Sequence, residues 1–201
     1  MKKTTAYFLT YFLCPLALLL LISCGGNDYI PKPRGFFRID FPEKEYHLFD
    51  SVCPYTFEYP VYANIVPDRN PMAEPYWINV EFPAFHGILH LSYKPVNNNL
   101  SQYFEDARSF VTKHIPKADD IIPTEYHNDS NNVHGIVYDI KGSGVASSYQ
   151  FCVTDSVRHY LRGALYFSTV PNNDSLAPVL DFVRADMNHM LSTLKWKELR
   201  K

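Results

Sequence analysis

The chain has 201 residues, with 19 lysine or arginine and 21 aspartate or glutamate residues, so its formal net charge is −2. This balance argues against nucleic acid as a partner, because phosphate binding needs a concentrated basic surface. The length suits one domain that buries roughly 70% of its unfolded surface, and the 15 tyrosines and 14 phenylalanines favour aromatic packing on sheets.

The first residues have the pattern of a secretion signal. Lys2 and Lys3 precede an almost wholly apolar run over residues 6–22, which small residues end. The sequence Leu21-Ile22-Ser23-Cys24 resembles the bacterial lipobox, whose cysteine receives diacylglyceride before cleavage. We therefore predict a lipoprotein signal peptide over residues 1–23 and lipidation of Cys24. The alternatives are an ordinary signal peptide with a chance cysteine, and a permanent transmembrane helix, for which about 20 apolar residues are needed.

Lipidation predicts membrane attachment of the mature chain. A lipoprotein cysteine normally carries three acyl chains, and each buried methylene contributes about 0.8 kcal/mol, so the protein should stay at its membrane. Residues 24–33 contain glycine, two prolines and no periodicity, which predicts a tether. Residues 34–201 are then expected to form a single domain.

The first half of this domain is rich in proline and in aromatic, strand-forming residues. A turn at residues 83–86 is expected to join two of its strands in a hairpin, and residues 67–75 read as a loop. The predicted strands cover residues 35–41, 55–59, 76–82 and 87–93.

The second half opens with helical periodicity. Apolar residues recur at steps of three and four over residues 100–115, with Asn98 or Asn99 as the N-cap and Pro116 as the stop. A second helix is predicted over residues 175–196, capped by Asp174 or Ser175. Between the helices, strands are predicted over residues 133–141, 145–154 and 157–168. The order predicts an α+β fold in which helices pack on one or both faces of an antiparallel sheet.

Two cysteines remain in the predicted domain, Cys53 and Cys152. An exported protein meets an oxidising compartment, so a disulfide between them is allowed. A sequence gives no separation between their Cα atoms, and Cys152 lies in an apolar run that equally suits a buried free thiol. Both readings stay open.

The sequence contains no catalytic constellation that we recognise. His86 and His90 are four residues apart but fall in a predicted turn and strand, so we predict no metal site. The stretch from Gly142 lacks the Gly-x-Ser-x-Gly pattern and suits a hairpin turn. We predict no catalytic residue, no cofactor and no enzymatic activity.

Three serines share one local pattern, because each follows aspartate and precedes an aliphatic residue: Ser51, Ser156 and Ser175. The pattern is similar to the acceptor for O-glycosylation of exported Bacteroidetes proteins. Turn and N-cap chemistry explains all three equally directly.

Several phrases, in order along the chain, resemble one family. They are Pro33-Arg34-Gly35-Phe36-Phe37-Arg38-Ile39, Cys53-Pro54-Tyr55-Thr56-Phe57-Glu58-Tyr59-Pro60, residues 91–100, residues 138–142, residues 146–151 and Leu161-Arg162-Gly163-Ala164-Leu165-Tyr166-Phe167. Together they resemble the gliding-motility-associated lipoprotein GldD family of Bacteroidetes. The resemblance implies a cell-envelope lipoprotein needed for gliding and linked to type IX secretion, with no catalytic motif to carry over. By fold analogy alone, the strand opening is also similar to the PsbP/Mog1-like sandwich, a binding scaffold.

Two functions follow from these observations. The first is docking onto other envelope proteins of a secretion or gliding complex. The second is binding of a small ligand or glycan in an aromatic cleft, with Tyr76-Trp77 as one wall. The residues after Cys24 lack the acidic run of a surface-export tag, so the domain is expected to face the periplasm; either membrane is open.

Overall fold

The computed structural model describes residues 38–169 and 172–198. The predicted signal peptide (1–23), the predicted lipidation site Cys24 and the predicted tether (24–33) lie outside the described residues.

A seven-stranded antiparallel sheet forms the centre of the described domain. Its strands run in the order β3-β4-β5-β9-β8-β7-β6, so two consecutive meanders are joined side by side by the β5–β9 pair. The strands are β3 (Asn64–Pro67), β4 (Ile78–Phe82), β5 (Gly87–Pro95), β6 (Asp120–Asn128), β7 (Val133–Lys141), β8 (Tyr149–Thr154) and β9 (His159–Phe167).

A smaller sheet has the order β1-β2-β10, with β1 at Tyr46–Phe49, β2 at Tyr55–Pro60 and β10 at Lys195–Trp196. Short 3₁₀ turns occupy Pro83–Phe85 (η1), Ile115–Lys117 (η2) and Asp129–Asn131 (η3).

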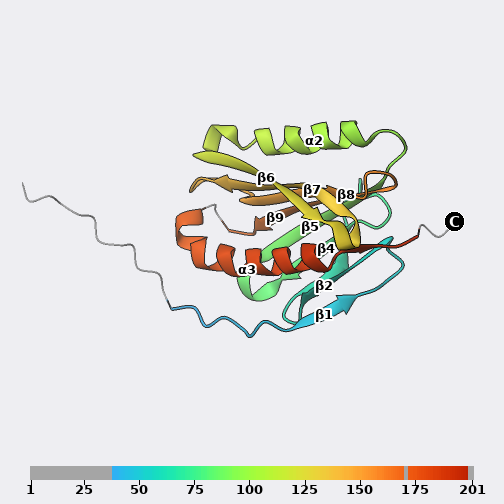
Figure 1. The fold of residues 1–201 in the computed structure, drawn as a ribbon. Helices are drawn as coiled ribbons and strands as arrows, with labels where there is room; N and C mark the ends of the chain where they lie inside the picture. Colours follow the sequence, from blue (N-terminus) through green and yellow to red (C-terminus); the bar gives the residue numbers. More distant parts are fainter. Residues whose placement is uncertain (1–37, 170–171, 199–201) are drawn as a thin grey trace, which may run out of the picture. The chain divides into compact units, whose positions relative to one another are not determined.

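The two helices cover opposite faces of the large sheet, as Figure 1 shows with α2 above it and α3 below. Helix α2 spans Leu100–Thr112 and packs against β8 and β9, whereas α3 spans Asn173–Thr193 and packs against β2. The small sheet therefore shares the α3 side.

Each face of the sheet has its own core. Tyr149, Phe151 and Val153 of β8 join the larger core with α3, while Cys152 joins the smaller core with α2. Successive side chains of a strand point to opposite faces. All six residues of β8 are buried, as expected for a central strand covered on both sides.

The predicted α+β class is confirmed, and so is the hairpin. Side chains at alternate positions of β4 and β5 are buried on the α3 side, while η1 forms the turn. Strand β7 spans the predicted residues 133–141.

Several boundaries were wrong, among them the strand predicted from residue 145, which begins at Tyr149. Residues 38–41 of the first predicted strand have no regular structure, because Phe41 stacks on Phe182 of α3, with ring centroids 4.3 Å apart, instead of joining a ladder. Helix α3 begins after Asn172 rather than at Ser175. It also ends before residue 196, since Leu194 turns to an extended conformation (ψ 130°) and the next two residues pair with β2.

The structure also corrects the expected N-cap of α2. It contains strands that the sequence did not predict. The side-chain oxygen of Asn99 accepts a hydrogen bond from the backbone N–H of Asn97 (2.8 Å) and caps no backbone N–H of the helix. Strands β1, β3 and β6 were not predicted. All three lie at the edge of a sheet, where partial exposure removes the alternating apolar pattern.

Candidate binding cleft

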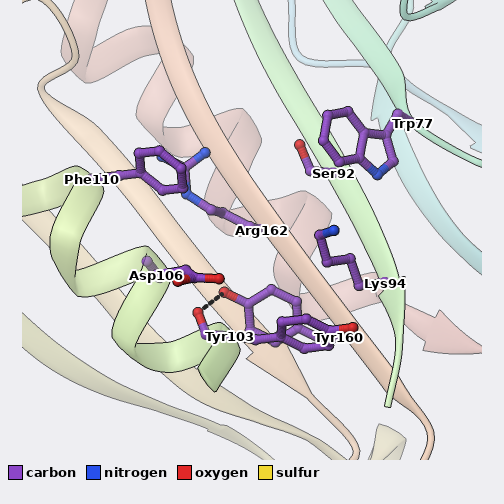
Figure 2. A pocket seen from close by; sticks show the side chains of 9 residues that line it. Trp77, Ser92, Lys94, Tyr103, Asp106, Phe110, Tyr160 and Arg162 are labelled. Carbon is purple, nitrogen blue, oxygen red and sulfur yellow. Dashed lines mark hydrogen bonds between the residues drawn. The ribbon is translucent and has the colours of Figure 1, made fainter. Parts of the chain in front are cut away.

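A cleft of about 370 Å³ lies where α2 meets the neighbouring strands β5 and β9 (Figure 2). Its lining is mixed, with aromatic rings, two cations, one carboxylate and the hydroxyls of one serine and two tyrosines. The lining residues are Trp77, Ser92, Lys94, Tyr103, Asp106, Ala107, Phe110, Tyr160 and Arg162.

The strand pairing and the helix period bring these residues together. Ser92 lies opposite Arg162, and Lys94 lies opposite Tyr160, in the β5–β9 register. The α2 residues that line the cleft, 103, 106, 107 and 110, follow the spacing of one helix face. The cleft is therefore built from four segments, namely Trp77, β5, α2 and β9, which the fold brings together.

Hydrogen bonds hold the aromatic wall in place. The Trp77 indole N–H donates to the Tyr93 carbonyl oxygen (2.8 Å), and the Tyr160 hydroxyl donates to the Tyr103 carbonyl oxygen (3.0 Å). The rings of Tyr103 and Tyr160 lie 5.1 Å apart. The Tyr103 hydroxyl donates to the Pro95 carbonyl (3.2 Å) and accepts from the Asn99 amide (2.9 Å). These bonds orient the wall before any ligand arrives.

The two cations of the cleft differ in how they are compensated. Lys94 forms an ion pair with Glu74, and its ammonium lies 5.7 Å from the ring centroid of Trp77. Arg162 donates from Nη2 to the neutral Gln150 Oε1 (2.6 Å), and its guanidinium lies 4.6 Å from the ring centroid of Phe110. Within the described part of the chain, no carboxylate lies within ion-pair distance of Arg162, so its charge is uncompensated there.

Two histidines lie close enough to Arg162 to feel its charge. Burial is the main cause that lowers the pKa of His90 and of His114. The Asp68 carboxylate raises the pKa of His90 in part, and the positive charge of Arg162 lowers the pKa of both histidines. Because Gln150 uses its oxygen to accept from Arg162, its amide N–H₂ donates to His114 Nε2 (3.0 Å). Because both pKa values lie below the ordinary histidine value, neither histidine adds positive charge near pH 7. Arg162 is the lining cation without a carboxylate partner among the described residues, and Lys113 lies nearby, with its ammonium 4.8 Å from the ring centroid of Phe110.

The predicted aromatic pair is split by the structure. Trp77 lines the cleft. Tyr76 has a left-handed backbone conformation (φ 69°) and packs edge-on against Tyr93, with ring centroids 5.9 Å apart. Sequence reasoning did not identify Lys94, Arg162 or the α2 residues. The available signals were the cations in two strands and Phe110, an exposed aromatic residue of the helix outside the apolar stripe that contains Tyr103 and Ala107.

The disulfide that the sequence allowed is not formed. Cys53 and Cys152 are both free and buried. Cys53 belongs to the core on the α3 side and Cys152 to the core on the α2 side, so the large sheet separates the thiols. Burial raises the pKa of Cys152 to about 11.

All three serines of the Asp-Ser-aliphatic pattern are exposed. Ser156 lies in the β8–β9 turn with φ 70°, where the Asp155 carboxylate accepts from the backbone N–H groups of residues 157–159 at 2.7–3.0 Å. Ser51 accepts from the Cys53 N–H (3.2 Å), and Ser175 lies in the first turn of α3. Turn chemistry thus accounts for Asp155, and modification of the serines stays a prediction.

Metal ligation and membrane crossing can be tested only on the described ranges. Across residues 38–169 and 172–198, no three His, Cys, Asp or Glu side chains gather in a way that could hold a metal ion. Neither described helix combines the length and apolar character needed to cross a bilayer.

The described fold and cleft define an α+β domain with a preformed hollow between a helix and its sheet. Residues 26–196 match the family described as gliding motility lipoprotein GldD, and the chain belongs to this family. It is thus a gliding-motility-associated lipoprotein of the cell envelope. No curated protein matches the chain.

Among solved structures, the chain is similar to the cyanobacterial PsbP (CyanoP) of Synechocystis sp. PCC 6803, determined in solution. The two share 10% sequence identity over 77% of this chain and 94% of that chain, with a TM-score of 0.49.

Proposed function

We propose that this lipoprotein acts by docking onto other proteins of a gliding or type IX secretion assembly, and not by catalysis. The observation that carries the proposal is that its buried reactive groups serve packing. His159 is hydrogen-bonded to the Tyr93 hydroxyl (2.9 Å), Asp186 to Lys44 (2.6 Å), and the thiol of Cys152 is held protonated by burial. Reactive groups in active sites are instead poised near the operating pH and open to substrate.

Anchoring sets where such docking takes place. We propose removal of residues 1–23, acylation of Cys24 and a tether over residues 24–33 that leads to the domain beginning at residue 34. The tether reaches at most about 30 Å when extended, so partners lie close to the anchoring membrane, on its periplasmic side. Membership of a lipoprotein family supports this arrangement.

Site-specific crosslinking in the native envelope tests the docking proposal. A photoreactive amino acid replaces one exposed apolar side chain at a time: Leu48 (64% exposed), Met72 (81%) or Val157 (67%). We expect at least one position to capture the same envelope proteins reproducibly under illumination, and none to do so in the dark. The proposal fails if a clean deletion leaves secretion, gliding and envelope complexes unchanged.

The second candidate function is binding of a small ligand or glycan in the cleft. The cleft volume of about 370 Å³ and the fixed aromatic wall favour it, because small-molecule sites are mostly preformed hollows with a few placed polar groups. Thermal melting with a saccharide library tests this candidate, and Trp77→Ala should abolish any stabilisation found.

We also propose O-glycosylation of Ser51, Ser156 and Ser175, and the exposure of these serines supports it. Intact-mass and peptide mass spectrometry of the protein from its own envelope tests it. Unmodified serines at all three positions would remove it.

A further inference from the structure

We propose that the cleft between α2 and strands β5 and β9 binds a saccharide that carries a single carboxylate, with Arg162 as the group that binds the carboxylate. This inference rests on the second candidate function and adds the chemical class of the ligand.

The charge of the cleft points to an anion. A guanidinium has five N–H donors in a planar fork that matches a carboxylate. Arg162 uses Nη2 for Gln150 and stacks on Phe110, and within the described ranges it has no acidic partner. In Figure 2 its side chain extends from β9 towards Phe110 across the hollow. A carboxylate there would form a charge-assisted pair with donors that are already oriented.

The charged side chains of the cleft also argue against a ligand of high negative charge. Lys94 is already neutralised by Glu74. Asp106 contributes a carboxylate to the lining, and its recorded partner is the neutral Gln102 amide (3.0 Å). Arg162 and Lys113 both lie over the Phe110 ring, and Asp106 is the carboxylate of the lining. This small excess of positive charge fits a ligand with a single carboxylate, whereas a polyphosphate would be repelled by Asp106.

The aromatic wall points to a ring. Trp77 is half-buried, and its indole N–H is bonded to the Tyr93 carbonyl oxygen, so its ring is fixed and can support a ligand ring. Tyr160 is only 3% exposed and forms the floor of the cleft, and the Phe110 ring already faces Arg162 and Lys113 at 4.6 and 4.8 Å from its centroid. The C–H face of a sugar ring is apolar and can lie on such surfaces, while its hydroxyls bond to polar groups around them. Ser92 and Asp106 supply a hydroxyl and a carboxylate for this purpose.

The sheet position of the cleft argues against an extended peptide. Strand addition needs a free sheet edge. Strand β5 is paired with β4 and β9, and β9 with β5 and β8, so the floor has no free backbone ladder. Recognition in this cleft therefore uses side chains, as for a saccharide.

The test uses the full acylated chain in detergent micelles on an array of uronic-acid saccharides, their neutral counterparts of the same linkage, and short peptides. Affinities for retained saccharides are measured by fluorescence of Trp77, after Trp196→Phe removes the second of the two tryptophans. We expect acidic saccharides to bind at least about tenfold more tightly than neutral ones, and Arg162→Gln to remove that preference. Arg162→Lys, which keeps the charge but loses the fork, should fall between.

Arg184→Gln is the matched control. Arg184 belongs to α3, outside the cleft, and its guanidinium lies 5.8 Å from the ring centroid of Tyr149. It is paired with Asp139 (2.9 Å), so its substitution removes the same charge from a site that has no free cation. The Arg184→Gln variant should bind acidic saccharides as tightly as the chain that keeps Arg184. Far-UV circular dichroism and melting curves confirm that each variant is folded.

The outcomes separate this inference from the proposed functions. Equal binding of acidic and neutral saccharides, or an unchanged preference in folded Arg162→Gln, overturns the carboxylate assignment but leaves cleft binding standing. Retention of peptides alone, or of no saccharide, overturns the inference entirely. Docking is then still judged by the crosslinking experiment, which does not use the cleft.

Discussion

Asp186 of α3 is the most deeply buried charged side chain that the structure describes, with 1% of its surface exposed. It accepts hydrogen bonds from Lys44 Nζ (2.6 Å) and from the hydroxyls of Tyr62 (2.6 Å) and Tyr46 (3.1 Å). Burial, followed by the charge of Asp186, raises the pKa of Tyr46 to about 12, so this hydroxyl stays a donor at any physiological pH. The segment around Lys44 is thus fixed to α3 by a satisfied buried carboxylate.

Replacing Lys44 should therefore destabilise the fold more than the partial exposure of this side chain suggests. We expect Lys44→Met to lower the free energy of unfolding by about 3 kcal/mol, because it leaves Asp186 buried without its counter-ion. Urea denaturation measures the change. Arg38→Met is the control, since Arg38 pairs with Asp40 at an exposed site in the same segment and should change stability by less than about 0.5 kcal/mol. Equal effects of the two variants would contradict the expectation.

His159 is a second buried polar residue, stacked on Trp196 with ring centroids 5.2 Å apart. Burial lowers its pKa, although the nearby Asp155 carboxylate raises it in part. Burial acts in the opposite direction on Asp155 and raises its pKa, but the backbone N–H groups of residues 157–159 outweigh burial, and the net pKa of Asp155 is lowered.

These shifts predict a loss of stability at acid pH. The unfolded chain binds a proton at His159 below about pH 6.5, whereas the folded chain resists it, so the free energy of unfolding falls as pH drops below that value. His159→Gln should flatten this dependence between pH 7 and 5. His90 and His114 also have lowered pKa values and should leave a residual slope. Urea midpoints across pH 5–8 measure the slope, and an unchanged slope would contradict the prediction. Asp155 adds its own loss only nearer pH 4.

Among the elements, β7 and β8 leave no room for a side chain at Gly135. A Cβ built there would lie 2.0 Å from the Cys152 carbonyl oxygen and 2.8 Å from the Val153 Cα, both backbone atoms that cannot rotate away. Glycine at this position is therefore required by the pairing of two strands in the middle of the fold.

Gly135→Ala should force β7 away from β8 and lower the free energy of unfolding by about 3 kcal/mol or more. Thermal and urea denaturation measure the loss. Gly144→Ala is the matched control in the next turn of the chain, because its Cβ would meet only the Lys117 side chain at 3.8 Å. If both alanines were tolerated equally, the close approach of the two strands would be wrong.

For the whole molecule, attachment to the membrane decides which partners it can meet. We expect labelled palmitate to be incorporated into the full chain in its own host and to be lost in Cys24→Ser, because one thiol receives the lipid. Cys53→Ser is the control and should keep the label, since its thiol is buried in the domain core. Label retained in Cys24→Ser would contradict the proposed anchor.

The sequence by itself determined the local features of this protein. The alternation of apolar and polar residues around residues 78–93 indicated a hairpin with one buried face. Apolar residues at three- and four-residue steps after residue 100 indicated a helix that lies on a sheet. The ordered phrases along the chain were enough to indicate its family, which matches residues 26–196.

Only the tertiary structure decided which distant segments meet. Ser92 faces Arg162 because β5 pairs with β9 across two meanders. Cys53 and Cys152 are kept apart because they lie on opposite sides of the large sheet. Periodicity reports how strongly each face is buried, whereas strand partners are chosen by non-local contacts that no short window of sequence contains. The cleft is a product of that choice, and its cation could be recognised only after the strands were placed.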